Sequence, residues 1–209
     1  IKNIFNINLN IFIRTILLTF SFLWFTYLGT QIGEDFVAAN SILINLVFLS
    51  AFILDAYAFS TEGIVGYSLG KKDLNLFKNI VKNSFILSSI SGLIISIIFF
   101  FTYNLVINLM SDINEIRELS SSYAVWLIIL PVISSFCYQF DGIFIGASQT
   151  KELRNAMIFS VFSYLLISIL LIKFLFNTGI WISLCIFMIL RAVSLFYYLD
   201  KIYLRFRKN

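Results

Sequence analysis

Four ionisable residues interrupt stretches of sequence that are otherwise apolar: Asp55, Glu62, Asp141 and Arg191. A charge at the centre of a membrane helix costs about 3 kcal/mol on insertion scales, so such groups normally face a cavity or one another. The functional interpretation is a site that binds a proton or a cation within the membrane. The structural interpretation is that Arg191 neutralises Glu62 or Asp141 and locks helices together.

The spacing of these residues places them at related depths. Glu62, Asp141 and Arg191 each lie nine or ten residues before a basic residue that ends their segment. A helical rise of about 1.5 Å per residue puts all three roughly 14 to 15 Å from the inner charged rim. Asp55 lies about two turns deeper than Glu62 on nearly the same face, because residues seven apart are offset by only about 20°.

Asp55 is the strongest functional candidate, followed by Asp141. It is the deepest carboxylate and no basic residue lies at its depth, so its charge could change with its environment. We expect Asp55 or Asp141 to supply the charge that binds the coupling ion, while Tyr138 and the many phenylalanines supply an apolar and cation-π surface for a substrate.

Several other polar or unusual residues lie near these charges. Pro131 is the only proline and falls within a predicted helix, where it removes a backbone hydrogen bond; it predicts either a bending point or a fixed kink. Tyr138 and Asp141 extend one polar stripe at helical spacing. The amides of Asn45 and Gln139 could bind substrate, although bridging between helices is the more common role of such groups.

Long apolar segments must position these residues. Hydrophobic residues make up 60% of the chain and charged residues only 12%, which is typical of a membrane protein with several spans. Residues 142–146, GIFIG, form a GxxxG motif that predicts close helix packing. Apolar runs of about 20 residues cross a bilayer as helices. We therefore predict an all-α polytopic membrane protein with six spans, near residues 11–31, 36–69, 76–103, 116–147, 153–176 and 179–204.

The basic residues predict the orientation, because positively charged loops stay on the cytoplasmic side. With the N-terminus inside, only Arg117 and Lys173 lie near outer ends. Both termini of this chain are then cytoplasmic, and the composition favours the inner (plasma) membrane of a bacterium. The residues expected at cytoplasmic ends are Lys2, Arg14, Lys71, Lys72, Lys78, Lys82, Lys151, Arg154, Lys201, Arg205, Arg207 and Lys208.

Composition also excludes several kinds of chemistry. The chain has no histidine, and Cys137 and Cys185 lie in apolar runs without metal-ligand spacing, so we expect no catalytic residues, no metal site and no cofactor. The basic residues are spread over loops rather than gathered in a patch, so we expect no nucleic-acid partner. The first residue is Ile rather than Met, which favours a fragment of a longer chain.

Three blocks of sequence carry a family resemblance: LDAYAFSTEGIVGYSLGKKD, LPVISSFCYQFDGIFIGASQTKELRNAM and LRAVSL. In order and spacing they resemble the C-terminal half of DinF-like members of the multidrug and toxic compound extrusion (MATE) family. The resemblance implies two six-helix bundles around a central cavity, with residues 1–209 as the second bundle. The N-terminal bundle, in the same or a separate chain, would then be its partner.

This resemblance implies efflux of small organic cations or other xenobiotics in exchange for H⁺ or Na⁺, with membrane lipids as the surroundings. The positions that carry over are Asp55, Glu62, Asp141 and Arg191. The proton-binding aspartate implied for DinF-like members lies in the N-terminal bundle, so the coupling ion stays open between H⁺ and Na⁺.

Three alternatives remain. A lipid-linked sugar flippase of the same fold would need several basic residues in its cavity, whereas only Arg191 is expected to be deeply buried. The chain could be a half that acts only with a partner, or that does not transport. An intramembrane aspartyl protease would use Asp55 and Asp141, but the GxGD motif of those enzymes is missing from this sequence.

Overall fold

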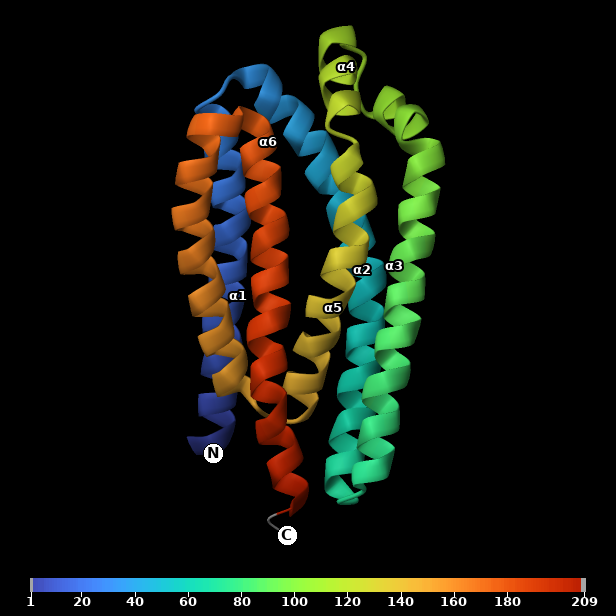
Figure 1. The fold of residues 1–209 in the computed structure, drawn as a ribbon, viewed down its shortest axis with the longest axis vertical. Helices are drawn as coiled ribbons and strands as arrows, with labels where there is room; N and C mark the ends of the chain where they lie inside the picture. Colours follow the sequence, from blue (N-terminus) through green and yellow to red (C-terminus); the bar gives the residue numbers. More distant parts are fainter. Residues whose placement is uncertain (1, 208–209) are drawn as a thin grey trace.

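The computed structural model describes residues 2–207, which form six helices (Figure 1). Five of these helices are long and apolar enough to cross a membrane; the exception is the short fourth helix. The chain is therefore an all-α membrane protein. The helices are α1 (Lys2–Thr30), α2 (Glu34–Gly70), α3 (Leu74–Met110), α4 (Asn114–Ser122), α5 (Val125–Gly146) and α6 (Thr150–Arg207).

Helix α6 contains both of the last two predicted segments, 153–176 and 179–204. Its backbone breaks at Phe176, where φ is 49° and ψ is −130°. The chain turns back at this residue, so α6 consists of two antiparallel arms (Figure 1). Each arm is longer than the roughly 20 residues that a span requires. Five span-length helices therefore carry the six segments expected from the sequence.

The prediction that the fourth span covers residues 116–147 is wrong about where the span begins. Helix α4 ends at Ser122 and α5 begins at Val125, so the beginning of the predicted span belongs to a separate short helix. Only Ile116 and Leu119 of α4 are apolar, and so polar a segment is poorly suited to hydrocarbon. The 22 residues of α5 are long enough to cross the membrane without it.

Tight turns join neighbouring helices. Lys72 adopts a left-handed φ of 55° between α2 and α3, and Ser148 does the same between α5 and α6. In the first turn the N–H of Asp73 donates to the carbonyl of Ser68 at 3.1 Å. The Asp73 carboxylate then caps α3 by accepting from the N–H of Leu76 at 2.9 Å. These turns lie at the same end of the bundle as both ends of the chain (Figure 1); that this end is cytoplasmic stays a prediction.

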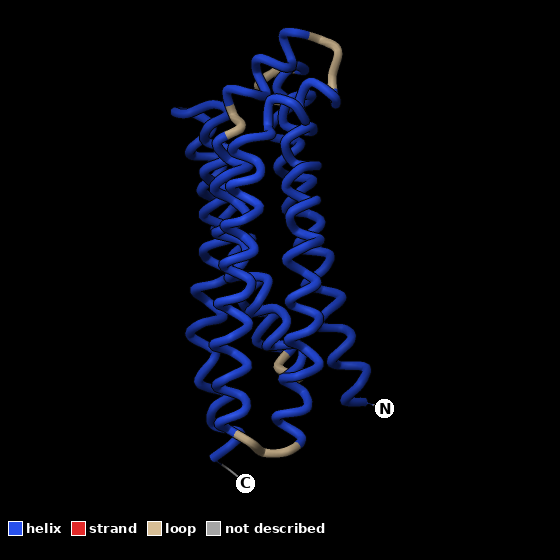
Figure 2. The backbone as a smooth tube through the Cα atoms, turned by 90° about the vertical axis from the view of Figure 1, so that its right-hand side faces the viewer, coloured by secondary structure: helices blue, strands red, loops and turns tan. Residues whose placement is uncertain are grey.

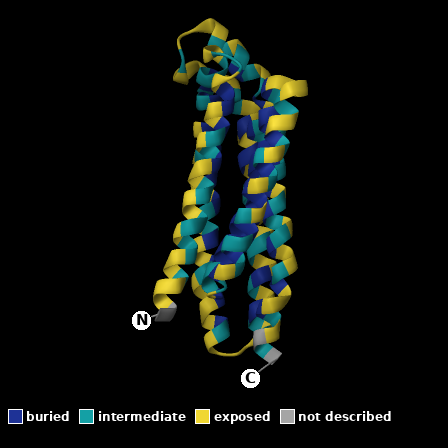
Figure 3. Cartoon of the chain, turned by 90° about the vertical axis from the view of Figure 1, so that its left-hand side faces the viewer, coloured by how far each residue is buried: buried dark blue, intermediate teal, exposed yellow. Residues whose placement is uncertain are grey.

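Helix α5 occupies the centre of the bundle. It packs against α2, α3 and α6, whereas α1 packs against α6 and α2 (Figures 1 and 2). Buried residues face the helix contacts, while exposed residues cover the outer faces of the long helices (Figure 3). Many exposed side chains on those faces are large and apolar, as expected for surfaces in contact with lipid or with another apolar surface.

The contact between α2 and α5 depends on two glycines. A Cβ at Gly142 would lie 2.3 Å from the carbonyl oxygen of Ala58, and one at Gly146 would lie 2.4 Å from that of Glu62. Both distances are far inside van der Waals contact, so the backbones approach more closely than any side chain permits. The close helix packing predicted from the GxxxG motif is confirmed.

Candidate functional site

Asp141 of α5 lies between two arginines that are distant in sequence. The Nη2 atom of Arg191, on the second arm of α6, donates to Oδ2 of Asp141 at 2.6 Å. Arg14 of α1 donates through its own Nη2 to the same oxygen. Arg191 is 1% exposed and Asp141 is 4% exposed. We call these three residues the Asp141 cluster; it ties together α1, α5 and α6.

The Asp141 cluster carries one negative and two positive formal charges, so its net charge is +1. Burial of a charge is tolerated in an apolar environment when it is paired and hydrogen-bonded, which both arginines achieve through Asp141. The second oxygen of Asp141, Oδ1, has no hydrogen-bond partner among the described residues, and neither does the Nε atom of Arg14 or Arg191. Hydrogen-bonding capacity therefore remains on both the carboxylate and the guanidiniums of the cluster.

Aromatic rings surround the Arg191 guanidinium. Its central carbon lies 5.5 Å from the ring centroid of Phe187 and 5.9 Å from that of Tyr138. Both distances fall within the range of cation-π attraction. Tyr138 is itself only 6% exposed. It therefore packs against the cluster and does not line an open surface, where it was expected to meet substrate.

Gln139 bridges two helices. Its Oε1 atom accepts a hydrogen bond from the Thr61 hydroxyl of α2 at 2.9 Å, and both side chains are buried. Its Nε2 atom has no hydrogen-bond partner among the described residues. Of the two roles considered for this amide, the geometry matches a bridge between α2 and α5.

Asp55 and Glu62 lie on α2, and both are half-buried. Neither forms an ion pair with another described residue. Asp55 lies within electrostatic range of all three members of the Asp141 cluster. Arg191 was expected to neutralise Glu62 or Asp141, and the structure brings it to Asp141. Glu62 is left outside the cluster.

Asn45 is exposed on α2 and takes no part in the cluster. A different amide on the same helix is buried. Asn40 donates to Oδ1 of Asn177 at 2.6 Å, and its own Oδ1 accepts from the Nδ2 of Asn177 at 3.1 Å and from the Nε1 of Trp181 at 2.9 Å. Asn40 and Asn45 are five residues apart, and the residue type alone does not predict which of the two is buried.

Pro131 lies within α5, six residues after its first residue, and is buried. Helix α3 holds this part of α5 closely: a Cβ at Gly92 would lie 2.8 Å from the Pro131 carbonyl oxygen. One turn further along α3, the Ser96 hydroxyl donates to the carbonyl of Ile128 at 2.6 Å. Of the two roles considered for Pro131, these contacts favour a fixed kink.

Arg14 is the site residue that sequence reasoning missed. It was expected at the cytoplasmic end of its segment, because that segment was taken to begin near residue 11. Helix α1 begins at Lys2, so Arg14 lies 12 residues along the helix. At about 1.5 Å per residue this is roughly 18 Å from the end. The depth of the other charges was estimated by counting residues from a basic residue at the inner end of their segment. The same count from Lys2 would have placed Arg14 within the membrane.

Comparison with known proteins agrees with this architecture. The MatE family model matches residues 11–172, which is more than half of the chain. DNA damage-inducible protein F of Escherichia coli (strain K12) is 31% identical over 194 residues, covering 93% of this chain and 42% of that protein. The chain therefore belongs to the MATE family of transporters and is a homologue of DinF. Because these proteins are transporters and not enzymes, the aspartyl protease alternative is wrong.

Solved structures share the fold. A MATE protein in complex with MaL6 matches with a TM-score of 0.87 at 15% identity, covering 100% of this chain and 48% of that one. A MOP superfamily transporter from Pyrococcus furiosus Vc1 (DSM3638) matches with a TM-score of 0.84 at 21% identity, covering 95% of this chain and 44% of that one. The chain thus spans about half the length of the relatives it matches.

Proposed function

We propose that this chain is one half of a cation-coupled antiporter that exports organic cations or other xenobiotics by alternating access. Its other half would be a six-helix bundle, in the same chain or a separate one, that closes a cavity against α1 and α2. Family membership and the half-length match support this proposal. The observation that carries it is a carboxylate, Asp55, that follows Phe52 of an apolar hollow by three residues and has no ion-pair partner among the described residues.

The hollow has a volume of about 480 Å³ and lies between α1 and α2. Phe22, Phe48 and Phe52 give it three aromatic side chains. Asp55 follows Phe52 by three residues, and is therefore about one helical turn away. An organic cation could place its apolar body on these rings and its charge near the Asp55 carboxylate.

Coupling would follow from the charge of the site. An ionised Asp55 balances the net charge of +1 on the Asp141 cluster, whereas protonation or Na⁺ binding at Asp55 leaves a positive charge uncompensated within the membrane. The two occupancy states then differ in their preference for the inward and outward orientations of the cavity. Substrate and coupling ion compete for the same carboxylate, which gives exchange.

Asp55→Asn tests this proposal. Efflux of a fluorescent organic cation is measured in proteoliposomes that contain the full-length protein, under an imposed pH gradient or Na⁺ gradient. We expect the variant to lose gradient-driven efflux while remaining monodisperse in detergent with an unchanged melting temperature. The matched control is Glu62→Gln, a half-buried carboxylate on the same helix, which should keep most of the activity. Wild-type efflux rates in Asp55→Asn would remove Asp55 from the mechanism.

The ion gradient that drives wild-type efflux identifies the coupling ion. Efflux that needs a pH gradient and persists without Na⁺ indicates H⁺. Efflux that follows the Na⁺ gradient at constant pH indicates Na⁺. Both results require the same carboxylate, so the Asp55→Asn variant should be inactive under either gradient.

A lipid-linked sugar flippase is the second candidate, because Arg14 adds a second guanidinium beside Arg191. Both arginines are already bound to Asp141, so a pyrophosphate would have to compete with that carboxylate for them. Competition separates the two functions. A lipid-linked oligosaccharide that blocks organic cation efflux at low concentration, while organic cations fail to stimulate ion exchange, would favour the flippase.

A further inference from the structure

A groove runs along the opposite side of the bundle from α1. Helix α3 and the second arm of α6 form its walls, and α5, which packs against both, forms its floor. In Figure 1, α1 lies behind α6. The proposed second bundle covers α1 and α2, so the groove between α3 and α6 stays open to the membrane.

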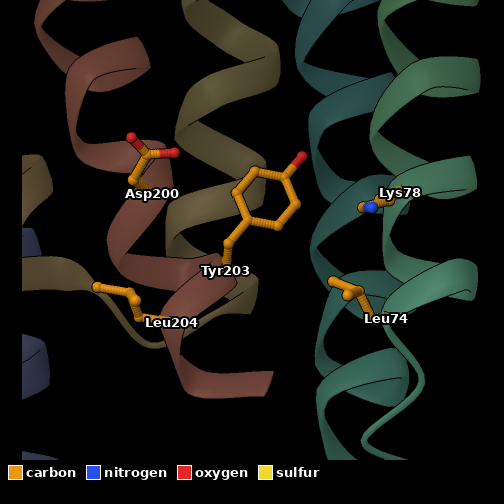
Figure 4. A pocket seen from close by; sticks show the side chains of 5 residues that line it. All are labelled: Leu74, Lys78, Asp200, Tyr203 and Leu204. Carbon is orange, nitrogen blue, oxygen red and sulfur yellow. The ribbon is translucent and has the colours of Figure 1, made fainter. Parts of the chain in front are cut away.

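The end of the groove near both chain termini is a hollow of about 540 Å³ with both polar and apolar lining, formed by Leu74, Lys78, Asp200, Tyr203 and Leu204 (Figure 4). Lys78 comes from α3, and Asp200 and Tyr203 come from α6, so the two opposite charges stand on opposite walls. Neither charge forms an ion pair with another described residue. The hollow thus presents a separated cation and anion together with a phenol.

A second hollow lies deeper along the same groove. Seven residues separate Lys78 from Phe85 on α3, and seven separate Phe196 from Tyr203 on α6, which is about 10 Å on each wall. This hollow has a volume of about 430 Å³ and no exposed polar surface. Its lining residues are Phe85, Phe136, Phe140, Ala192, Val193 and Phe196.

We propose that this groove binds one phospholipid with a phosphate and an ammonium group in its headgroup, as in phosphatidylethanolamine. The Lys78 ammonium and the Tyr203 hydroxyl hold the phosphate, the Asp200 carboxylate holds the headgroup ammonium, and the aromatic hollow holds an acyl chain. Basic pockets between membrane helices bind lipid headgroups. Here the acid on the facing wall selects a zwitterionic headgroup over an anionic one, because a purely anionic headgroup would meet the unpaired carboxylate of Asp200.

Native mass spectrometry of the purified full-length protein tests this assignment, with equal amounts of phosphatidylethanolamine and phosphatidylglycerol as probes. We expect the wild type to retain phosphatidylethanolamine about fivefold more than phosphatidylglycerol, which is the scale of one partly exposed ion pair. Lys78→Ala should lower the retention of both lipids. Asp200→Asn should remove the preference between them. Lys82→Ala is the matched control, since Lys82 is exposed one turn further along α3 and does not line the hollow.

Two results would overturn the proposal. One is equal or stronger retention of phosphatidylglycerol by the wild type, which would indicate a general anionic lipid surface. The other is unchanged lipid retention in Lys78→Ala.

If a charge variant is not monodisperse, the Val193→Trp variant tests the acyl-chain site instead. Val193 is 44% exposed, so the larger side chain fills the apolar hollow from outside. It should lower retention of long-chain phosphatidylethanolamine but not of a dihexanoyl analogue, and equal loss or no loss of both would contradict the groove.

Discussion

Arg14 and Arg191, 177 residues apart in sequence, donate to the same carboxylate oxygen, Oδ2 of Asp141. The first and last long helices are therefore joined through a single atom on the central helix. Each guanidinium depends on that oxygen for its ion pair, because neither pairs with any other described carboxylate. A change at Asp141 consequently affects three helices at once.

Asp141→Ala should strongly destabilise the protein. The substitution leaves two guanidiniums in an apolar environment without their counterion, and loss of one partner of a buried ion pair typically costs about 3 to 5 kcal/mol. The measurement is the free energy of unfolding in detergent, by chemical denaturation. A change below about 1 kcal/mol would indicate that water or lipid already neutralises the arginines.

A double-mutant cycle then isolates one of the two pairs. Arg191→Met and Asp141→Leu should each destabilise the protein when made alone. The combined variant should be less destabilised than the sum, because no uncompensated charge remains at position 191. Additive effects would show that Arg191 and Asp141 do not interact.

Gly142→Ala should destabilise the contact between α2 and α5. The new methyl would lie 2.3 Å from the Ala58 carbonyl oxygen, so the helices must separate. We expect a loss of about 1 to 3 kcal/mol in unfolding free energy, as for other overpacked sites. Gly63→Ala is the matched control, since a Cβ there meets no atom within 4 Å. Equal effects of the two substitutions would contradict the close approach.

Asn40→Leu should be costly, whereas Asn45→Leu should be nearly neutral. Asn40 satisfies the buried Asn177 amide and the Trp181 indole, and both would lose their partner at about 1 to 3 kcal/mol for an unsatisfied buried group. Asn45 is exposed on the same helix. Thermal unfolding of the two variants in one detergent compares them directly, and similar melting temperatures would contradict the network.

Pro131→Ala should leave transport close to the wild-type rate if the kink is fixed by packing. Helix α3 holds this turn through Gly92 and through the hydrogen bond from Ser96 to the Ile128 carbonyl. Efflux in proteoliposomes measures the rate. A loss of transport without a loss of stability would instead make Pro131 a bending point of the transport cycle.

Much of the architecture could be predicted from the sequence, because helical spans in a membrane depend on local composition and length. Apolar runs of about 20 residues identify helices wherever water is missing to satisfy the backbone. The two arms of α6 were predicted on this basis, and the close contact between α2 and α5 was predicted from the GxxxG motif. The start of α5 was not, because two apolar residues in α4 extended the apparent hydrophobic run.

The candidate site could be predicted only in part. Depth along a helix follows from residue counting, so Asp141 and Arg191 were correctly placed at the same level. The pairing of Arg191 with Asp141 was one of two possibilities, because Glu62 was placed at a similar depth and could have paired with Arg191 instead. Counting does not give the direction in which each helix face points, and so the exposed Asn45 was chosen over the buried Asn40.

The sequence by itself determined that this chain crosses a membrane, that Asp55, Glu62, Asp141 and Arg191 interrupt its apolar segments, and which family it belongs to. These properties depend on composition, on the helical spacing of residues and on the order of motifs along a single chain. Only the tertiary structure decided that Arg14 joins Arg191 at one oxygen of Asp141, that Asp55 remains unpaired among the described residues, and that Lys78 of α3 and Asp200 of α6 line one hollow. Those relationships depend on the rotation and packing of helices far apart in sequence, which local periodicity does not specify.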